Sequence, residues 1–406
     1  MTTDVLDGVL DDARGLLDDA VELRRRIHRE PELGLELPKT QANVLEALDG
    51  LPLAVSTGAT TSSVVAILDG DAPGPTVLLR GDMDALPMHE DTGLDFASEV
   101  DDAMHACGHD THVAMLAGAA RLLAERRGSF AGRIAFMFQP GEEGFHGARF
   151  MLEEGLLDHV SANGSPVSLA FALHQSPTFP SGLIATRGQA LLASANTVRV
   201  TVKGRGGHAS MPHHALDPIP IACEIVMALQ SMVARRIDAF DPAVVSVARI
   251  QAGTTDNVIP ETAEPLGTIR TVSAETRAQV LDEVRRVAEG VAAAHGAEAE
   301  VDLVEGYPVT VNDVDAAAFA LDTAARLLGE GATATLPTPI MGAEDWSYVL
   351  QQVPGAMAFL GTGPGGPGPV APNHSNRMVV DESAMAAGIA TYVGVALRWL
   401  DQGAAG

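Results

Sequence analysis

The chain has 406 residues, of which 46% are hydrophobic, and carries a formal net charge of −27 at pH 7. This length and composition predict a folded protein with two domains and argue against a disordered chain. The negative charge argues against a nucleic-acid partner, because phosphates are neutralised by Lys and Arg, of which the chain has only 26.

Further features of the sequence concern the cellular compartment of the protein. Cys107 and Cys223 are the only cysteines, too few for a disulfide framework, which fits a reducing compartment. The acidic N-terminal segment lacks the basic region and the apolar run of a signal peptide. No stretch approaches the roughly 18 consecutive apolar residues of a membrane span. The sequence therefore predicts a cytoplasmic protein with no membrane partner.

Short apolar runs along the chain are typical of strands that are buried on both faces, and helical patterns lie between them. The runs are SVVAIL (63–68), TVLLR (76–80), RIAFMF (133–138), SLAFAL (168–173) and AMAFLG (356–361). A helical pattern also follows His109, with Asp110 or Thr111 placed to cap it. This alternation predicts an α/β fold around a mainly parallel sheet.

The middle of the chain has a different pattern, in which strand-like and helix-like segments follow one another as β-α-β-β-α-β. The segments are a strand at 197–203, a helix at 217–237, strands at 243–250 and 264–272, a helix at 275–294 and a strand at 299–305. That order is typical of a ferredoxin-like domain. We therefore predict a discontinuous catalytic domain, residues 1–190 and 306–406, with a second domain, residues 191–305, inserted into it.

Side chains that can bind metal follow the buried strands and also fill one short segment, MHACGHDTH (104–112). Because ligands of open α/β sheets gather at the carboxyl ends of the strands, we expect these side chains to meet at one edge. Thiolate, imidazole and carboxylate groups together suit two metal ions that keep open positions. The candidate ligands are Cys107, His109, Glu143, His174 and His374.

Each candidate also has a simpler interpretation when it is taken alone. Cys107 could be a small buried hydrophobe, Glu142 and Glu143 could form a solvated face, and GDMD (81–84) could be a turn. Convergence of several independent segments favours the metal site. In that case one glutamate binds metal while its neighbour stays free to move protons, so Glu142 is the candidate general base toward an attacking water.

Motifs distributed over nearly the whole chain closely resemble the M20 metallopeptidase family, and within it the amidohydrolase branch of hippurate, N-acyl-amino-acid and auxin-conjugate hydrolases. The motifs are GDMDALP, MHACGHDTHVAMLAGAA, QPGEEGFHGAR, ALHQSP, GRGGHASMPH, GTTDNVIPETAEPLGTIRT, MGAEDW and PNHS. The resemblance implies the same two-domain plan, with the inserted domain as lid and dimer interface. It also implies two divalent metal ions per subunit, Mn²⁺ or Zn²⁺ in the first place and Co²⁺ or Ni²⁺ as alternatives.

Carried over residue by residue, the resemblance makes Cys107, His109, Glu143, His174 and His374 the ligands, and Glu142 the base that later protonates the leaving amine. Many M20 peptidases have a His-x-Asp motif after the second strand, whereas this chain has Asp82-Met83-Asp84, as the amidohydrolase branch does. This removes one histidine ligand. It leaves Asp84, with Asp82, to orient the metal ligands by contacting them without binding the metal.

The resemblance also implies roles for three residues of the inserted domain. His208, in GRGGHAS, would stabilise the oxyanion of its own or the other subunit, and Asn257 and Arg270 would position substrate. Without the resemblance, His208 would be interpreted as a surface residue and Arg270 as a strand residue in a salt bridge.

The predicted function is hydrolysis of the amide bond of a small-molecule N-acyl amino acid by a homodimer or higher homo-oligomer. The alternatives are a dipeptidase or carboxypeptidase of the same family, and a catalytically silent protein that binds acylated amino acids.

Overall fold

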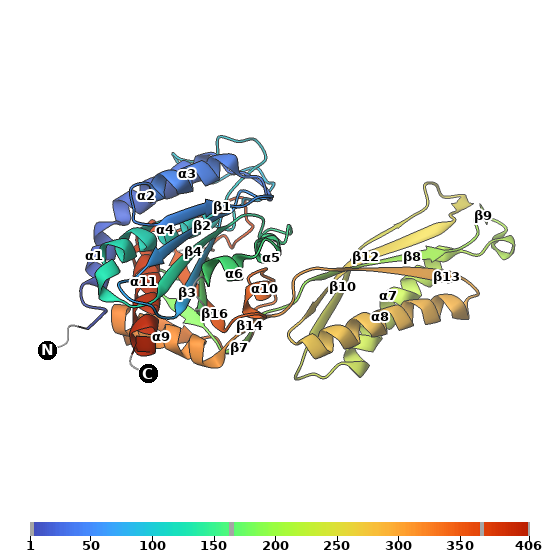
Figure 1. Cartoon of the computed structure of the whole chain (residues 1–406). Helices are drawn as coiled ribbons and strands as arrows, with labels where there is room; N and C mark the ends of the chain where they lie inside the picture. The colour runs from blue at the N-terminus through green and yellow to red at the C-terminus, as the bar shows by residue number, and fades with distance from the viewer. Residues whose placement is uncertain (1–3, 162–165, 366–368, 405–406) are drawn as a thin grey trace. The chain divides into compact units, whose positions relative to one another are not determined.

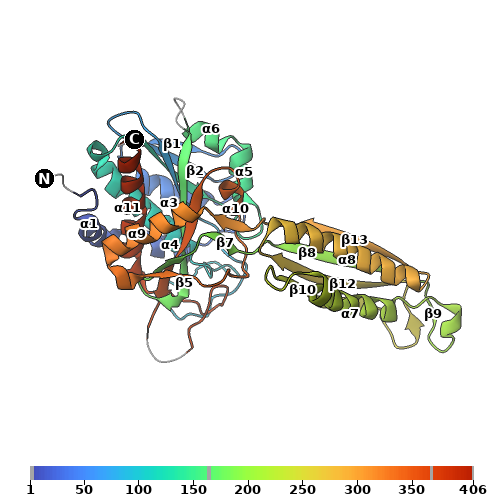
Figure 2. The same cartoon turned by 90° about the horizontal axis from the view of Figure 1, so that it is seen from below.

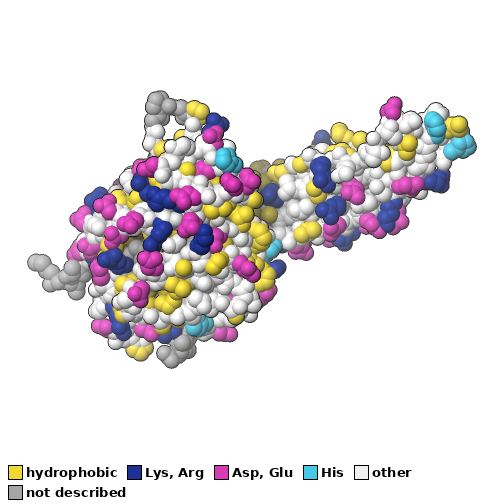
Figure 3. Space-filling view, turned by 90° about the horizontal axis from the view of Figure 1, so that it is seen from above, with side chains coloured by type: hydrophobic (Ala, Val, Ile, Leu, Met, Phe, Trp, Pro, Cys, Tyr) yellow, Lys and Arg dark blue, Asp and Glu magenta, His cyan; other side chains and the backbone are white. Residues whose placement is uncertain are grey.

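The structure is a computed structural model that describes residues 4–161, 166–365 and 369–404. The chain forms two compact units (Figure 1). The first comprises Met1–Leu191, Val311–Thr338 and Tyr348–Gly406, and the second comprises Leu192–Thr310 and Pro339–Ser347. Acidic side chains, with arginines among them, are spread over the visible face of the first unit (Figure 3).

An eight-stranded sheet runs through the first unit, and β3 pairs in parallel with both β4 and β5, as β5 does with β16. The strands in spatial order are β1 (Ala54–Thr57), β2 (Val64–Asp69), β4 (Arg133–Gln139), β3 (Thr76–Asp82), β5 (Val167–Pro180), β16 (Gly355–Gly363), β6 (Ile184–Thr186) and β15 (Thr333–Thr335). Three neighbouring pairs in this sheet are antiparallel: β1 with β2, β2 with β4, and β6 with β16. The predicted α/β fold with a mainly parallel sheet is confirmed.

Helices bury the sheet, which explains why its central strands are apolar on both faces. Helices α4 (His109–Glu125), α9 (Val314–Leu328) and α11 (Met385–Ala404) pack together on one side (Figure 2). Their partners on the sheet include Leu79, Phe136 and Phe171 in one continuous core. Outside them lie α1 (Val9–Gly15), α2 (Leu17–Arg29) and α3 (Pro38–Leu48), while α5 (Gly147–Glu153), α6 (Leu156–Val160) and α10 (Ser347–Leu350) are short.

The second unit contains an antiparallel sheet of four strands in the order β10-β12-β8-β13, and α7 and α8 pack against it (Figure 1). Along the chain the elements are β8 (Asn196–Lys203), α7 (Pro218–Arg236), β10 (Ala243–Ala252), β12 (Thr262–Thr271), α8 (Ala274–Ala294) and β13 (Glu298–Glu305). Asp217 and Ser273 cap the two helices by accepting hydrogen bonds from backbone N–H groups. A short ribbon pairs β9 (Gly207–His208) with β11 (Val258–Ile259).

Two of these helices, α7 and α11, are long and apolar enough to cross a membrane by length and composition. In this structure α11 is a core helix of the first unit, with Ile389, Val393 and Leu397 buried. Helix α7 packs Ile225 and Leu229 into the core of the second unit. Burial inside the protein accounts for the composition of α11, whereas α7 buries one side and leaves Met227 exposed.

Two local predictions are wrong. His174 does not follow its strand, because β5 continues through it from Val167 to Pro180. Neither Asp110 nor Thr111 caps α4, which begins after Gly108 with a φ of 78° and no side-chain cap hydrogen bond. The carboxylate of Asp110 instead accepts hydrogen bonds from α2.

Candidate metal centre

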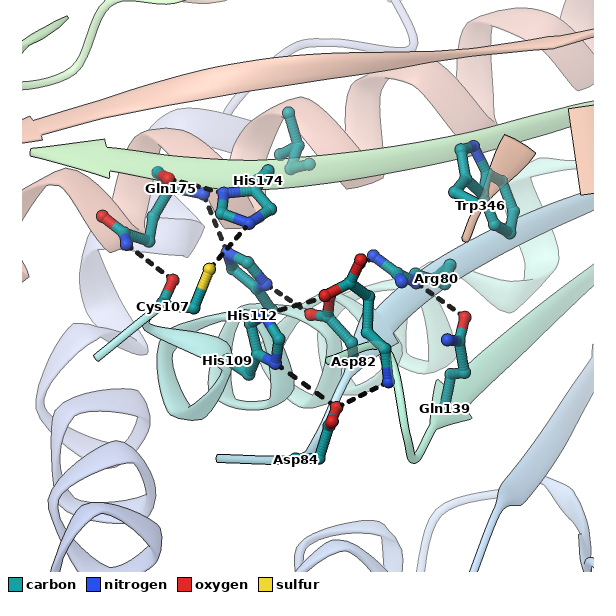
Figure 4. A network of polar contacts seen from close by, with 12 residues as sticks. Arg80, Asp82, Asp84, Cys107, His109, His112, Gln139, His174, Gln175 and Trp346 are labelled. Atoms are coloured by element: carbon teal, nitrogen blue, oxygen red, sulfur yellow. Dashed lines mark hydrogen bonds and ion pairs between the residues drawn. The ribbon is translucent and has the colours of Figure 1, made fainter. Parts of the chain in front are cut away.

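The five predicted ligands come from four different elements or loops of the first unit and form two groups that share Cys107. Figure 4 shows three of them, Cys107, His109 and His174, close together. The ligand atoms of Cys107, His109 and His174 all lie within 4.8 Å of one another. Those of Cys107, Glu143 and His374 meet the same limit. The sulfur of Cys107 therefore belongs to both groups.

Backbone geometry holds these ligands in place. Cys107 and His109 flank Gly108, whose left-handed conformation turns the chain into α4. His374 is a non-glycine residue with a φ of 66°, and its N–H donates to the carbonyl of Ala106 over 2.9 Å. Backbone conformations of this kind are costly and are concentrated at functional sites. The hydrogen bond ties the loop that carries His374 to the loop that carries Cys107.

The imidazole of His174 is oriented toward Cys107. Its Nδ1 donates to the carbonyl oxygen of Gln175 over 2.6 Å, and its Nε2 lies 3.4 Å from the Cys107 sulfur. A backbone carbonyl on the far ring nitrogen is the usual support of a metal-binding histidine, because it fixes the tautomer that leaves the other lone pair free. Burial lowers the pKa of His174 well below its ordinary value, so the ring is neutral and able to bind metal.

The electrostatic environment of His109 favours a cation. Burial alone would lower its pKa, but the carboxylates of Asp82, Asp84 and Glu143 outweigh burial and raise the pKa to about 10. Its Nε2 lies 3.4 Å from Asp82 and 3.9 Å from Glu143. Without a metal the imidazole of His109 is therefore protonated. A divalent ion bound to His109 would supply positive charge in place of that proton.

Several buried polar atoms around the site make no hydrogen bond of good geometry with the described residues and are held by ion-pair contacts within the cluster: both ring nitrogens of His109, Oδ2 of Asp82 and Oε1 of Glu143. Burial and then the nearby carboxylates raise the pKa of the Cys107 thiol well above its ordinary value, so it needs a cation to ionise. These residues fit a site for divalent metal ions.

Asp84 holds the loop that carries the two glutamates. Its Oδ1 accepts the backbone N–H of Glu142 and its Oδ2 accepts that of Glu143, each over 2.9 Å. Its Oδ1 also lies 3.5 Å from Nδ1 of His109. One carboxylate therefore fixes both glutamates relative to a ligand on another element.

Sequence reasoning missed the polar support behind Asp82. The carboxylate lies 2.8 Å from Nη1 of Arg80 and receives a hydrogen bond from Nδ1 of His112, whose Nε2 accepts the N–H of Gln175. Arg80 is fully buried inside the apolar run of β3. The sequence does contain a signal for this support, because a charged residue such as Arg80 within a strand that is buried on both faces needs a buried partner.

A second buried network lies behind His109, on its neighbour Asp110. Oδ2 of Asp110 accepts hydrogen bonds from Nε of Arg24 over 2.6 Å and from Nδ1 of His28 over 2.8 Å. Nη1 of Arg24 also donates to Glu382 over 2.9 Å, and Nε2 of His28 lies 3.3 Å from Glu90. The network ties α2 to the segment of the candidate metal ligands and to the short turn, Glu382–Ala384, that precedes α11.

His28→Gln is expected to lower stability most at mildly acid pH. Burial alone would lower the pKa of His28, but Asp110 and Glu90 outweigh it and raise the pKa. A raised pKa stabilises the fold fully below the unfolded value of about 6.5, and this contribution is lost as pH rises through the folded pKa. Urea unfolding of both proteins at pH 6 and pH 8.5 measures the difference, which should shrink at the higher pH. A difference that does not change with pH would contradict a charged His28.

The three remaining predicted site residues belong to the second unit. His208 is exposed in β9, and the N–H of Ala209 beside it donates to the carbonyl of Asn257 over 3.1 Å. Arg270 in β12 is half-buried, donates to Thr268, and forms no ion pair with a described carboxylate. His208 and Asn257 thus lie together, while Arg270 lies in the neighbouring four-stranded sheet.

Comparison with known proteins gives a consistent result. Residues 78–398 match the family described as "Peptidase family M20/M25/M40". The chain is 39% identical over 400 residues to thermostable carboxypeptidase 1 of Saccharolobus solfataricus, which covers 98% of this chain and 99% of that protein. It is 40% identical over 343 residues to N-acetylcysteine deacetylase of Bacillus subtilis, covering 84% of this chain and 88% of that protein.

A solved structure agrees with these relatives. The Bacillus subtilis YXEP protein, a dinuclear metal binding peptidase from the M20 family, is 35% identical and superposes with a TM-score of 0.81. The match covers 95% of this chain and 99% of that one. The chain therefore belongs to peptidase family M20/M25/M40, and it is a metal-dependent hydrolase of amide or peptide bonds.

Proposed function

We propose that the chain hydrolyses the amide bond of N-acyl amino acids and releases a carboxylic acid and a free amino acid. The observation that carries the proposal is the position of the Cys107 sulfur, which lies within 4.8 Å of ligand atoms from two different groups. An oxygen of Glu142 lies within the same distance of His109 and Glu143. A shared thiolate with a carboxylate beside it suits hydrolysis at a two-metal site.

We assign one metal to Cys107, His109 and His174, and the other to Cys107, Glu143 and His374. The mixture of sulfur, nitrogen and oxygen ligands suits Zn²⁺, Mn²⁺, Co²⁺ or Ni²⁺, and among these the family resemblance favours Mn²⁺ or Zn²⁺. When bound, such ions polarise the amide carbonyl and lower the pKa of water.

Glu142 is the general base in this proposal. Its side chain is only 6% exposed, and its backbone is held by Asp84, so the carboxylate stays beside the ligands. It takes a proton from the attacking water and returns it to the nitrogen of the leaving amine. Asp84 acts through Glu142 and His109 by fixing their positions.

We further propose that residues of the second unit contact the substrate. His208 would donate to the developing oxyanion, and Asn257 would orient the substrate. Arg270 has no carboxylate partner among the described residues, which suits it to the carboxylate of an amino acid.

We propose that the chain is a cytoplasmic homodimer. Strand β10 is an edge of its sheet and exposes Val244 and Ile250, and α7 beside it exposes Met227. Unpaired edges and exposed apolar groups on one side of a unit favour pairing with a second copy.

A carboxypeptidase is the alternative, because one relative that matches over nearly the whole chain is a carboxypeptidase. The deciding experiment measures amine release by the Mn²⁺- or Zn²⁺-loaded protein from N-acetyl and N-benzoyl amino acids, and from dipeptides and N-blocked peptides. We expect kcat/KM to be highest for an N-acyl amino acid. Higher kcat/KM for the peptides would favour the carboxypeptidase, and no release from any of them would favour a binding protein.

A further inference from the structure

Gln175 follows the candidate ligand His174 in β5, and the proposed mechanism does not use its side chain. The residue is fully buried. Two hydrogen bonds fix its backbone: the N–H donates to Nε2 of His112 over 2.8 Å, and the carbonyl oxygen accepts Nδ1 of His174 over 2.6 Å (Figure 4). A buried amide side chain that starts from a rigid backbone needs partners in fixed positions for its donors and its acceptor.

The side-chain amide of Gln175 connects two segments that carry metal ligands. Its Nε2 donates to the carbonyl oxygen of Cys107 over 2.7 Å and to Oδ1 of Asn373, the neighbour of His374, over 2.8 Å. Its Oε1 accepts a hydrogen bond from Oγ1 of Thr362 over 2.7 Å, so both ends of the amide are paired. One uncharged side chain thus holds the Cys107 loop and the His374 loop at a fixed separation.

The glycine between two of the ligands leaves room for this amide. A Cβ atom built on Gly108 would lie 2.6 Å from Nε2 of Gln175, closer than real Cβ atoms approach another atom. Gly108 therefore has two uses: its φ of 78° turns the chain into α4, and its missing side chain admits the amide beside Cys107.

The two metal sites depend on the amide to different degrees. We call the site of Cys107, His109 and His174 the first site, and the site of Cys107, Glu143 and His374 the second site. The first site takes His109 from the start of α4 and His174 from β5, which are both regular elements. The second site takes His374 from a loop, where its side chain is 54% exposed. This loop is tied to the Cys107 segment by the N–H of His374 and, through Asn373, by Gln175.

We propose that Gln175 is a positioning residue that completes the second site by holding Asn373 and Cys107 together. This inference rests on the proposed function, in which two metals share one thiolate. Without the amide, the His374 loop loses one of its two ties to the Cys107 segment, whereas the ligands of the first site keep their places in α4 and β5. Removing a group that orients a metal ligand typically costs about 10- to 100-fold in metal affinity.

The test is Gln175→Met, which keeps the length of the side chain and removes its amide. Metal-free protein is titrated with Co²⁺, and bound metal is measured by equilibrium dialysis together with the visible spectrum. We expect the Kd of the first ion to stay within about twofold of the wild type and the Kd of the second ion to rise by about 10- to 100-fold. His374→Ala, which removes a ligand of the second site only, identifies that ion in the titration. Hydrolysis of N-acetyl-L-alanine should be weak at two equivalents of Co²⁺ and should return when Co²⁺ is in excess.

The matched control is Asn312→Leu, because Asn312 is another buried amide of the first unit. Its Oδ1 accepts the N–H of Met357, and its Nδ2 donates to the carbonyl oxygens of Met357 and Arg187, none of which belongs to a ligand. This variant should lower the free energy of unfolding and leave both Kd values unchanged.

Asn373→Ala keeps the inference testable if Gln175→Met does not fold. It removes the contact from the loop side, at a residue that is only partly buried. We expect the Kd of the second ion to rise by about tenfold while the Kd of the first ion stays the same.

An equal change in both Kd values, or a change in neither, would overturn the role of Gln175. Lost activity that does not return in excess Co²⁺, although both ions are bound, would also overturn it. A wild type that binds two ions but hydrolyses no N-acyl amino acid would refute the proposed function alone, because the titration still tests Gln175. A wild type that binds only one ion would overturn the shared thiolate and the role of Gln175 together.

Discussion

Glu142→Gln is expected to lower kcat on an N-acyl amino acid by about a thousandfold while leaving the bound metal unchanged. Glutamine has the shape of glutamate but cannot take a proton from water. The backbone N–H of residue 142 still donates to Asp84, so the loop keeps its place and Glu143 keeps its position as a ligand. The loss should therefore be in kcat and not in metal affinity or folding.

Initial rates with saturating substrate, together with elemental analysis of bound metal, measure this expectation. Glu153→Gln is the matched control, because Glu153 is a glutamate at the end of α5 that forms an exposed ion pair with Arg149. It should retain wild-type activity. A Glu142→Gln protein that kept a tenth of the activity or more would refute Glu142 as the general base.

Cys107→Ala is expected to lose both metal ions, and not only one. Its sulfur belongs to both groups of ligands, so each group would be left with two protein ligands. The remaining carboxylates, Asp82, Asp84 and Glu143, would then surround His109 without the thiolate that connects the two sites. Affinity for the metals should fall enough that the purified variant contains less than one ion per chain and has no activity.

The other cysteine provides the control for this substitution. Cys223 lies on the exposed side of α7, in the second unit. Cys223→Ala should bind metal and hydrolyse substrate as the wild type does. A Cys107→Ala protein with one tightly bound metal would indicate that the thiolate serves a single site.

Local sequence pattern was sufficient to predict the main elements. The run at 133–138 lies within β4 (Arg133–Gln139), and the helix predicted at 275–294 is α8 (Ala274–Ala294). Strands buried on both faces form continuous apolar runs, and amphipathic helices have a clear period, so neither depends on distant contacts. The β-α-β-β-α-β order of the second unit was read from the same periodicities.

Interactions between distant residues could not be predicted in this way. Asp110 was interpreted as a helix cap from its local position, but its partner Arg24 lies 86 residues away along the chain. The extent of β5 beyond His174 depends on pairing with β16, which reaches Pro180. The residues of the candidate site could be named from the motifs, whereas the sharing of Cys107 between two groups of ligands required coordinates.

The most direct test of a two-metal hydrolase is a titration of the metal-free protein with Mn²⁺ or Zn²⁺, in which bound metal and amide hydrolysis are measured in the same samples. We expect two ions to bind per chain and activity to reach its plateau at the second equivalent. Cys107→Ala should neither bind two ions nor hydrolyse the amide. Full activity at one equivalent, with no second ion bound, would contradict the shared thiolate and the mechanism built on it.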